Sequence, residues 1–367
     1  MKKVLLISNG FYPENSPRSI RATELAIELA KQGHEITVLT HPIEDVECFC
    51  ENRNILFKSL GVLTWPAPKL KGRGFVLVFW RIVVRISKLY FEYPGIQLIW
   101  LVKKALKKES GYDLLISIAV PYPIHWGVAA ARSKKHRIAK VWVADCGDPY
   151  MGQENDTFKP PKYFSLLERS FCKKAEFISV PFEGAIKSYY NEFHHKIKVI
   201  PQGLTFPDLK REIRTSKLVK FAYAGNISSY MHYAIPFFNL LNLIDDDFLF
   251  VIYTNDKARY TKILDDKTLL KCQFNDYVDR IQLITELNKV DFLIHFPYKI
   301  QIQKSLKLVD YHFLCKPILS YTGDERSNTT FKEFLNSEFS NKLSNESIDC
   351  YKIENVAKRF IELTESN

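Results

Sequence analysis

The stretch KVLLISNGFYPENSPRSIRATELAIELAKQGHEITVLT (residues 3–40) decides the fold. Residues 3–8 contain a short continuous apolar run, which is typical of a strand buried on both faces of a parallel sheet. Residues 19–33 follow with apolar side chains at helical spacing and end at Gly33, a common helix stop. Residues 34–40 form a second apolar run. Strand, helix and strand in immediate succession predict the first unit of a doubly wound parallel sheet.

The same alternation continues along the chain in two cycles. The first cycle adds expected strands at residues 113–119, 139–145 and 177–181 and a helix at 162–175. The second adds a helix near 232–244 and expected strands at residues 220–225, 248–254, 291–297 and 317–321. The predicted fold class is α/β, with two doubly wound parallel-sheet (Rossmann-like) domains that face each other across a cleft.

The expected domain limits follow from these cycles. Residues 1–206 form the N-terminal domain and residues 207–350 the C-terminal one, with a polar linker at 211–217. Residues 351–367 form a terminal helix for which packing back on the N-terminal domain is an open option. A length of 367 residues with 46% hydrophobic side chains is enough for two cores.

Composition excludes several classes of protein. The seven cysteines show no paired spacing, which argues against a disulfide framework or a zinc module and fits a reducing cytoplasm. The N-terminal apolar run is too short for a signal peptide and lacks a small-residue cleavage site. No apolar stretch reaches the roughly 18–20 residues of a membrane span. We therefore expect a cytoplasmic protein.

Ligands of open α/β sheets bind beyond the carboxyl ends of the strands, so the loops there carry the candidate residues. Residues 9–18 lack the GxGxxG dinucleotide pattern, but Ser16 and Arg18 stand at a helix start that suits an acceptor group or a phosphate. A turn with an N-cap explains the same residues. His125 follows the strand at 113–119, where a catalytic and a structural role both remain open.

Two acids follow the strand at 139–145. Asp145 and Asp148 suit sugar hydroxyls or an acceptor, and Asp148 is the candidate catalytic acid of the pair. Asp148-Pro149 is equally compatible with a simple turn. No group of residues has a specific metal-ligand spacing, so no metal site is expected.

The second half offers a donor site. Gly225 and Asn226 end the strand at 220–225, where backbone amides can approach a phosphate. Ser305 is a good N-cap for the next helix, and Lys304 and Lys307 flank it, so this helix start favours a diphosphate. Asp310 lies about a turn and a half further on. It suits the two hydroxyls of a ribose, or else an ion pair with Lys307 on the helix surface.

Taken in order, these motifs resemble the retaining GT-B glycosyltransferases of family 4, found in bacterial polysaccharide synthesis. The stretches that carry the resemblance are FYPENSPRSIRATELAIELAKQGHEITVLT, YDLLIS, LLERSFCKKAEFISVP, KVIPQGL, ELNKVDFLI and SLKLVDYHFLCKPILSY. The resemblance covers nearly the whole chain. It implies metal-independent transfer of a hexose-like sugar from a nucleotide-sugar donor, with no further cofactor, to a glycan acceptor, for example in capsule or O-antigen assembly.

The resemblance also assigns residues. Asp310 matches the second Glu of the family's motif of two Glu separated by seven residues, which implies a ribose ligand. Ser305 and Lys307 fall where the diphosphate meets the helix, and Gly203 matches the glycine of a "PNG" motif near the donor. Two departures stand out: Ile302 occupies the place of the first Glu, and residues 226–231 lack the family's Arg and Lys.

Residues 69–108 carry ten Lys and Arg and the single acid Glu92, so this segment holds a charge of +9 out of the chain's +11. Arg81, Arg85 and Lys88 lie at i, i+4 and i+7 on one helical face, beside an apolar one. Such a helix suits an anionic membrane surface. A core helix with a solvated basic face is the alternative, and the apolar character argues against nucleic acid.

The sequence thus predicts a glycosyltransferase that is peripheral at the inner face of the cytoplasmic membrane, with a lipid-linked acceptor. Two other functions remain open. A non-catalytic GT-B-like binding subunit would keep the fold despite the residues it lacks. A sugar-nucleotide epimerase shares the fold but requires an acid/base pair that the sequence does not display.

Overall fold

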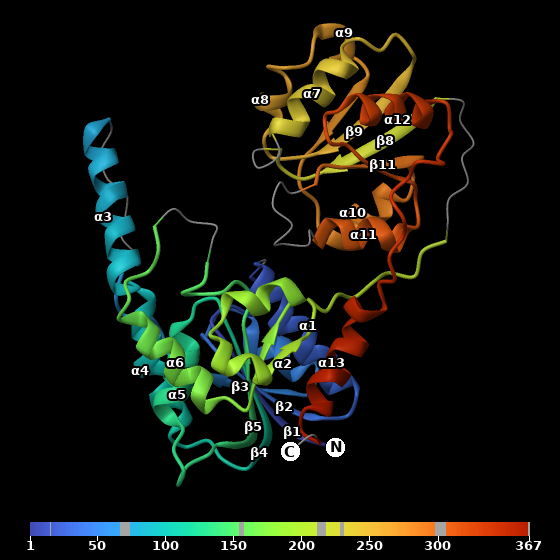
Figure 1. The fold of residues 1–367 in the computed structure, drawn as a ribbon. Coiled ribbons are helices and arrows are strands. Elements are labelled where there is room, and N and C mark those ends of the chain that lie inside the picture. Colours follow the sequence, from blue (N-terminus) through green and yellow to red (C-terminus); the bar gives the residue numbers. More distant parts are fainter. Residues whose placement is uncertain are drawn as a thin grey trace. The chain divides into compact units, whose positions relative to one another are not determined.

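The computed structural model describes residues 1–14, 16–66, 74–153, 158–210, 218–227, 231–297 and 306–365 (Figure 1). The chain divides into two compact units. The first unit comprises residues 1–205 and 350–367, and the second comprises residues 206–349. Each unit has its own parallel sheet and its own core. The expected linker at 211–217 lies outside the described residues.

The sheet of the first unit has the strand order β3-β2-β1-β4-β5-β6-β7, and neighbouring strands are parallel throughout. The order reverses between β1 and β4, which is the switch point of a doubly wound sheet. Its strands are β1 (Lys3–Ser8), β2 (Glu35–Thr40), β3 (Ile55–Ser59), β4 (Tyr112–Ile118), β5 (Ala139–Asp145), β6 (Phe177–Val180) and β7 (Ile197–Val199).

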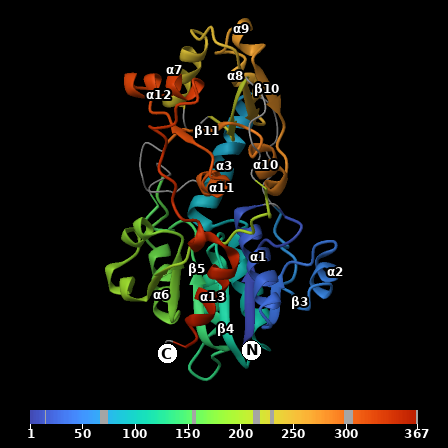
Figure 2. The ribbon, with the colours of Figure 1, turned by 90° about the vertical axis from the view of Figure 1, so that its right-hand side faces the viewer.

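Helices cover both faces of this sheet because successive strand residues point to opposite sides. On β1, Val4 and Leu6 face a core that includes α1 (Pro17–Lys31), α2 (Val46–Glu51) and α13 (Ile353–Glu362) (Figure 2). Leu5 and Ile7 face the other core, which is completed by α4 (Leu98–Leu106), α5 (Pro123–Ala131) and α6 (Phe164–Lys174).

The C-terminal helix α13 belongs to the first unit. Leu204 pairs with Lys352 in a parallel bridge just before the helix begins. Gly203 lies so close to α13 that a Cβ atom there would come within 2.4 Å of Ile353 Cδ1. A larger residue at this position would therefore require the Ile353 side chain to shift.

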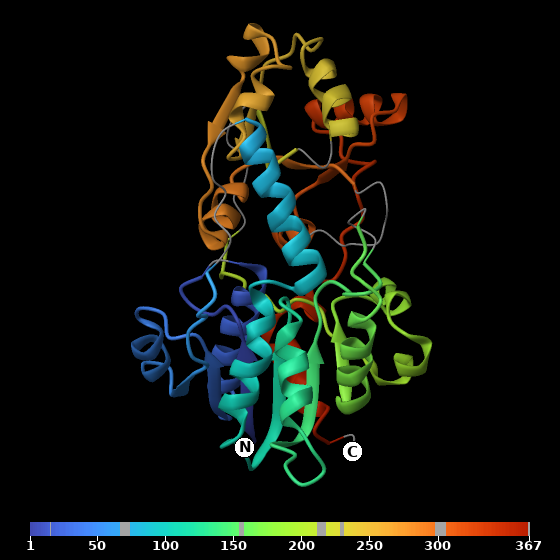
Figure 3. The same ribbon diagram turned by 90° about the vertical axis from the view of Figure 1, so that its left-hand side faces the viewer.

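Helix α3 (Phe75–Phe91) differs from the other long helices of the unit, because none of its 17 residues is buried. It extends away from the sheet on the side of α4 and α5 (Figure 3). Phe75 is 86% exposed, and Phe79, Ile82 and Ile86 are each about half exposed. No helix in the described part of the chain is long and apolar enough to cross a membrane.

The second unit contains a smaller parallel sheet with the order β10-β9-β8-β11-β12. Its strands are β8 (Val219–Ala224), β9 (Phe248–Tyr253), β10 (Cys272–Asn275), β11 (Phe292–His295) and β12 (Ile318–Ser320). Its helices are α7 (Met231–Leu241), α8 (Lys257–Tyr260), α9 (Asp266–Leu269), α10 (Arg280–Leu287), α11 (Leu306–Leu314) and α12 (Glu325–Leu335).

Strand β8 shows how this sheet is covered on two faces. Phe221 and Tyr223 belong to a core that includes residues of α7 and α12, whereas Ala222 and Ala224 belong to a core that includes residues of α10 and α11. Both sheets are therefore doubly wound, and the prediction of two Rossmann-like α/β domains is confirmed.

Candidate functional site

In the first unit, a buried ion pair joins helix α1 to the carboxyl end of β5. The Arg21 guanidinium of α1 donates to both oxygens of Asp145, at 2.5 and 2.6 Å, and to the backbone oxygen of Pro201 at 2.7 Å. The Ser179 hydroxyl also donates to Asp145. Burial raises the pKa of Asp145, but Arg21, Arg18 and Ser179 outweigh it and hold this pKa below its usual value. Asp145 is thus a structural anion, not an exposed sugar ligand.

Ser16 and Arg18 lie at the start of α1. Ser16 is the N-cap, and its hydroxyl accepts from the Ser19 amide at 3.3 Å. Arg18 Nη1 lies 3.5 Å from Asp145 Oδ2, and about a fifth of its side chain is exposed. The N-cap alternative thus describes the geometry of Ser16, while Arg18 places a partly exposed cation beside the carboxyl end of β5. The acceptor or phosphate role of this pair stays a prediction.

His125 lies in the core of the first unit and is fully buried. Ser117 accepts from Trp142 Nε1 and places its own hydroxyl 2.8 Å from His125 Nδ1, while Nε2 lies 3.5 Å from the Cys146 sulfur. Burial lowers the pKa of His125 to about 3, so the ring is neutral at physiological pH. His125 has no exposed atom, and both ring nitrogens contact protein groups. This geometry fits the structural role of His125 and not the catalytic one.

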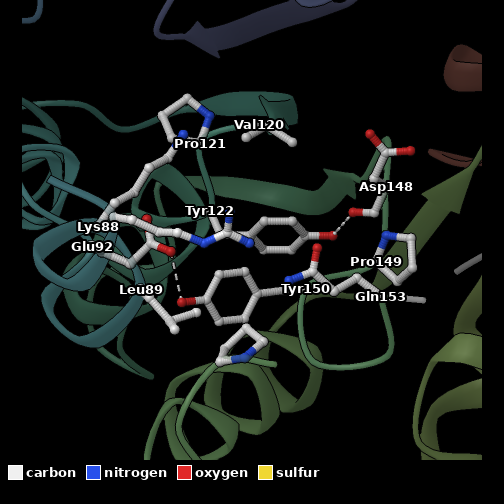
Figure 4. Close-up of a pocket in the computed structure, with 12 residues that line it drawn as sticks. Lys88, Leu89, Glu92, Val120, Pro121, Tyr122, Asp148, Pro149, Tyr150 and Gln153 are labelled. Carbon is white, nitrogen blue, oxygen red and sulfur yellow. Dashed lines mark hydrogen bonds between the residues drawn. The ribbon is translucent and has the colours of Figure 1, made fainter. Parts of the chain in front are cut away.

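Asp148, in contrast, is exposed and lines a pocket of about 440 Å³ (Figure 4). Its backbone oxygen accepts from the Tyr122 hydroxyl at 2.5 Å, which fixes the loop after β5 against the loop after β4. The pocket walls come from the end of α3 and from these two loops: Arg85, Lys88, Leu89, Glu92, Val120, Pro121, Tyr122, Asp148, Pro149, Tyr150, Gln153 and Pro160. Asp148 therefore lies where a ligand of the first unit can reach it.

Two tyrosines form the floor of this pocket. The rings of Tyr122 and Tyr150 lie 5.1 Å apart, and the Tyr150 hydroxyl donates to Glu92 Oε1 at 2.8 Å (Figure 4). Burial raises the pKa of Glu92, which Tyr150 and Lys88 oppose only in part. Aromatic surface, a carboxylate and two cations together suit a ligand with both hydroxyl and acidic groups.

In the second unit, Gly225 follows β8 with a φ of +125°, a backbone conformation that favours glycine. A Cβ atom there would also lie 3.0 Å from Lys307 Nζ. The neighbouring Asn226 is held by Thr254, whose hydroxyl donates to its side-chain oxygen at 3.2 Å. The structure therefore brings together three of the residues that the sequence proposed for the donor: Gly225, Asn226 and Lys307.

Lys307 lies in the first turn of α11 and points at the end of β8. Its ammonium donates to the Tyr223 hydroxyl at 3.0 Å and lies 4.4 Å from the centre of that ring. Burial lowers the pKa of Lys307 to about 8. A bound phosphate would favour the charged ammonium of Lys307 and so oppose the effect of burial on its pKa.

Asp310 is buried one turn further along α11, and its partner is Arg280. The Arg280 guanidinium, at the start of α10, donates to Asp310 Oδ1 at 2.5 Å from Nη2 and 3.1 Å from Nε. Burial raises the pKa of Asp310, and Arg280 opposes this rise. The surface pairing with Lys307 is therefore replaced by a pair with Arg280. The ribose role of Asp310 stays a prediction.

The remaining residues that the sequence analysis considered for the donor are Lys304, Ser305, Ile302 and Gly203. Lys304, Ser305 and Ile302 lie outside the described residues. Gly203 belongs to the first unit, where its contact with α13 gives a packing reason for the glycine. Among the residues that the structure describes, no group of three or more His, Cys, Asp or Glu could hold a metal ion.

Sequence reasoning missed the arginines that organise both sites. Arg21 and Arg280 contact acids 124 and 30 residues away in the chain, and no local pattern announces such pairs. Tyr122 and Tyr150 were missed as well. Their positions directly after two buried strands were the available signal, because the carboxyl ends of adjacent parallel strands meet at one edge.

Comparison with known proteins relates the chain to a family. The model of Glycosyltransferase Family 4 matches residues 19–205. Three solved structures are similar along the chain. A glycosyltransferase from Rickettsia africae ESF-5 has 12% identity and a TM-score of 0.59, covering 100% of this chain and 98% of that one. HepE from Anabaena, in complex with UDP and glucose, has 11% identity and a TM-score of 0.58, covering 100% of both chains.

The third is TarM, with 10% identity, a TM-score of 0.64 and 99% of each chain covered. At these identities the likeness shows the fold, which is the GT-B fold of two Rossmann-like domains. No curated protein matches the chain.

Proposed function

Because the chain belongs to glycosyltransferase family 4, and its chemistry is therefore sugar transfer, we propose that it is a retaining, metal-independent transferase of cell-surface polysaccharide biosynthesis. The donor is a nucleotide sugar and the acceptor a lipid-linked glycan. HepE, which shares the fold, was solved with UDP and glucose. The enzyme works in the cytoplasm as a peripheral protein of the inner membrane face.

The observation that carries the proposal is the cluster at the end of β8. The Lys307 ammonium of α11 meets Gly225, a glycine at positive φ, at the end of β8, and Asp310 lies buried one turn further along the same helix. Lys307 supplies positive charge for a diphosphate, the backbone at Gly225 permits close approach, and Asp310 lies one turn deeper for a ribose. A leaving diphosphate gains negative charge in the transition state, so a fixed ammonium lowers the barrier.

The acceptor site of this proposal is the pocket of the first unit. Asp148 is the exposed acid of the pocket wall and accepts a hydrogen bond from an acceptor hydroxyl. His125 has no part in this step because its ring is enclosed by the core. The acceptor hydroxyl attacks the anomeric carbon on the face from which the diphosphate leaves, so retention requires no protein nucleophile. The leaving diphosphate takes the acceptor proton, so the step requires no separate protein base either.

Helix α3 supports the membrane location. It exposes Phe75, Phe79, Ile82 and Ile86. Its basic residues Arg81, Arg85 and Lys88 are exposed beside this apolar face. An amphipathic helix of this kind gains free energy both from apolar burial in the lipid interface and from attraction to anionic headgroups.

The nucleotide role is tested by Asp310→Ala. Nucleotide sugars with different bases are first screened for thermal stabilisation of the protein, and the best binder is titrated by calorimetry. Loss of the ribose contacts is expected to weaken binding by about 2 kcal/mol, or roughly 30-fold. Asp276→Ala, which removes an exposed acid of the same unit, is the control and leaves the affinity unchanged. Equal affinity of wild type and Asp310→Ala would reject the ribose role.

A further inference from the structure

Helix α3 carries two exposed groups of side chains on different sides. At 100° per residue, Phe75, Phe79, Ile82 and Ile86 form one apolar side. Arg81, Arg85 and Lys88 form a stripe about a third of a turn away. We call this stripe the cationic stripe. All seven side chains are exposed.

The cationic stripe leads into the pocket of the first unit. Arg85 and Lys88 line the pocket together with Leu89 and Glu92, at the spacing of one helix face. Arg81 continues the same stripe one turn further from the pocket. The apolar side runs parallel to the cationic stripe and continues to the start of the helix at Phe75.

The charged side chains of the pocket differ in how far they are exposed to a ligand. Glu92 is largely enclosed and accepts the Tyr150 hydroxyl, so it is engaged with the floor of the pocket. Arg85 lies over the Phe158 ring at 4.7 Å, which holds its guanidinium at the wall. Lys88 is exposed. Asp148 lies on the opposite loop, beyond Tyr122 (Figure 4).

This order of surfaces matches a molecule that has an apolar chain, a phosphate and a hydroxyl-rich group in sequence. We propose that the pocket recognises the acceptor at its sugar–phosphate junction. Arg85 and Lys88 bind the phosphate, the Tyr122–Tyr150 floor and Asp148 bind the first sugar, and the apolar side of α3 binds the start of the lipid chain. The proposal rests on the proposed transferase function and makes Arg85 and Lys88 specificity-determining residues for a lipid-linked phosphate.

The proposal is tested by binding alone, without a donor and without vesicles. Three probes are titrated by calorimetry below their aggregation concentrations: octyl diphosphate, octyl glucoside and inorganic pyrophosphate. We expect octyl diphosphate to bind at least tenfold more tightly than either of the others. Pyrophosphate binding as tightly as octyl diphosphate would identify a site for free phosphate and overturn the lipid-linked assignment. Octyl glucoside binding as tightly would overturn the phosphate assignment.

Variants locate the binding. Arg85→Gln/Lys88→Gln is expected to lower octyl diphosphate affinity at least tenfold and to leave octyl glucoside affinity within twofold. Phe79→Ser/Ile82→Ser should reduce the advantage of octyl diphosphate over pyrophosphate. Lys134→Gln/Lys135→Gln removes two exposed cations beyond the other end of α5 and serves as the control. An unchanged octyl diphosphate affinity in Arg85→Gln/Lys88→Gln, with an unchanged unfolding midpoint, would overturn the proposal.

The two proposals fail in different ways. Binding as predicted, with no sugar transfer from any nucleotide sugar, would reject the transferase function and leave the phosphate pocket standing. Transfer at equal catalytic efficiency to acceptors with and without a phosphate would support the transferase function and reject the phosphate pocket.

Discussion

The Arg21–Asp145 pair shows how one residue can tie three segments of the first unit together. Arg21 comes from α1, Asp145 ends β5, and Pro201 lies in the segment that leads to α13. Both side chains are almost fully buried, at 3% and 2% exposure. Removing one partner leaves an uncompensated buried charge, which is far more costly than losing an exposed pair.

We therefore expect Asp145→Asn to lower the free energy of unfolding of the first unit by about 3–5 kcal/mol. Asp113→Asn is the matched control, because Asp113 pairs at 2.7 Å with a Lys140 side chain that is largely exposed. That change is expected to cost no more than about 1 kcal/mol. Urea unfolding followed by tryptophan fluorescence measures both values. Equal costs for the two variants would contradict the structural role of Asp145.

Lys307 gives the donor site a pH dependence. The burial-lowered pKa of about 8 means that the free protein carries the ammonium below this pH and loses it above. Because a diphosphate binds the charged form, nucleotide affinity is expected to fall about tenfold per pH unit above pH 8 and to be nearly constant just below pH 7.5. Calorimetric titration with UDP, GDP or ADP between pH 7 and 9.5 measures this.

Lys307→Arg is the control for this effect, since a guanidinium stays charged over the whole range. Its nucleotide affinity is expected to change little between pH 7 and 9.5. A flat pH profile in the wild-type protein would show that the Lys307 ammonium does not meet the phosphates.

Single residues were the hardest part to predict from the sequence. The position of Lys307 at the start of a helix, behind a strand and opposite a glycine, could be inferred from local patterns. The partners of Asp145 and Asp310 could not, because they depend on how α1 and α10 pack in three dimensions. For the same reason, an expected loop histidine became a core side chain: α5 starts at Pro123 and turns His125 inward toward Ser117.

At the scale of elements, the apolar strands and amphipathic helices were predictable, including the edge strand β12 within the expected 317–321, whereas the edge strands β3 and β10 were not. The expected strand at 139–145 coincides with β5, and the expected helix at 162–175 contains α6. Edge strands β3 and β10 are only partly buried and carry mixed polar and apolar residues, so their periodicity is weak. Helix α12 has a polar first turn that conceals its buried Phe331 and Phe334.

Helix α3 carries the prediction at this scale. Arg81→Glu/Arg85→Glu/Lys88→Glu reverses three charges beside the apolar side. Each basic residue near an anionic surface contributes about 1 kcal/mol, so we expect binding to phosphatidylglycerol vesicles to weaken by roughly two orders of magnitude. Sedimentation with these vesicles, and with neutral phosphatidylcholine vesicles, measures the loss.

The control reverses three exposed charges near the amino ends of the strands in the first unit. Lys108, Lys134 and Lys135 precede β4 and β5, and their replacement by Glu gives the same change in net charge. This control variant should still sediment with anionic vesicles. Equal sedimentation of the wild type and the α3 variant with anionic vesicles would contradict the membrane proposal.

At the scale of the whole molecule, the order of elements was enough to predict two doubly wound sheets. A parallel sheet requires a crossover between successive strands, so the alternation of buried strands and amphipathic helices leaves few other folds. The chain also passes back from the second unit to the first through residues 349–350, and α13 completes the core around α1. The terminal apolar periodicity indicated a helix, whereas its site of packing depends on the shape of the α1 surface.

The assignment of chemistry to this fold rests on the donor cluster of the second unit and the pocket of the first. The most direct test incubates the purified protein with the nucleotide sugar that stabilises it most and with a lipid-linked diphosphate sugar. Proton NMR of the product then gives the anomeric configuration. The account predicts a new glycosidic bond with the configuration of the donor sugar and no requirement for added metal. An inverted product, an epimerised free donor, or tight donor binding with no transfer to any acceptor of this class would contradict it.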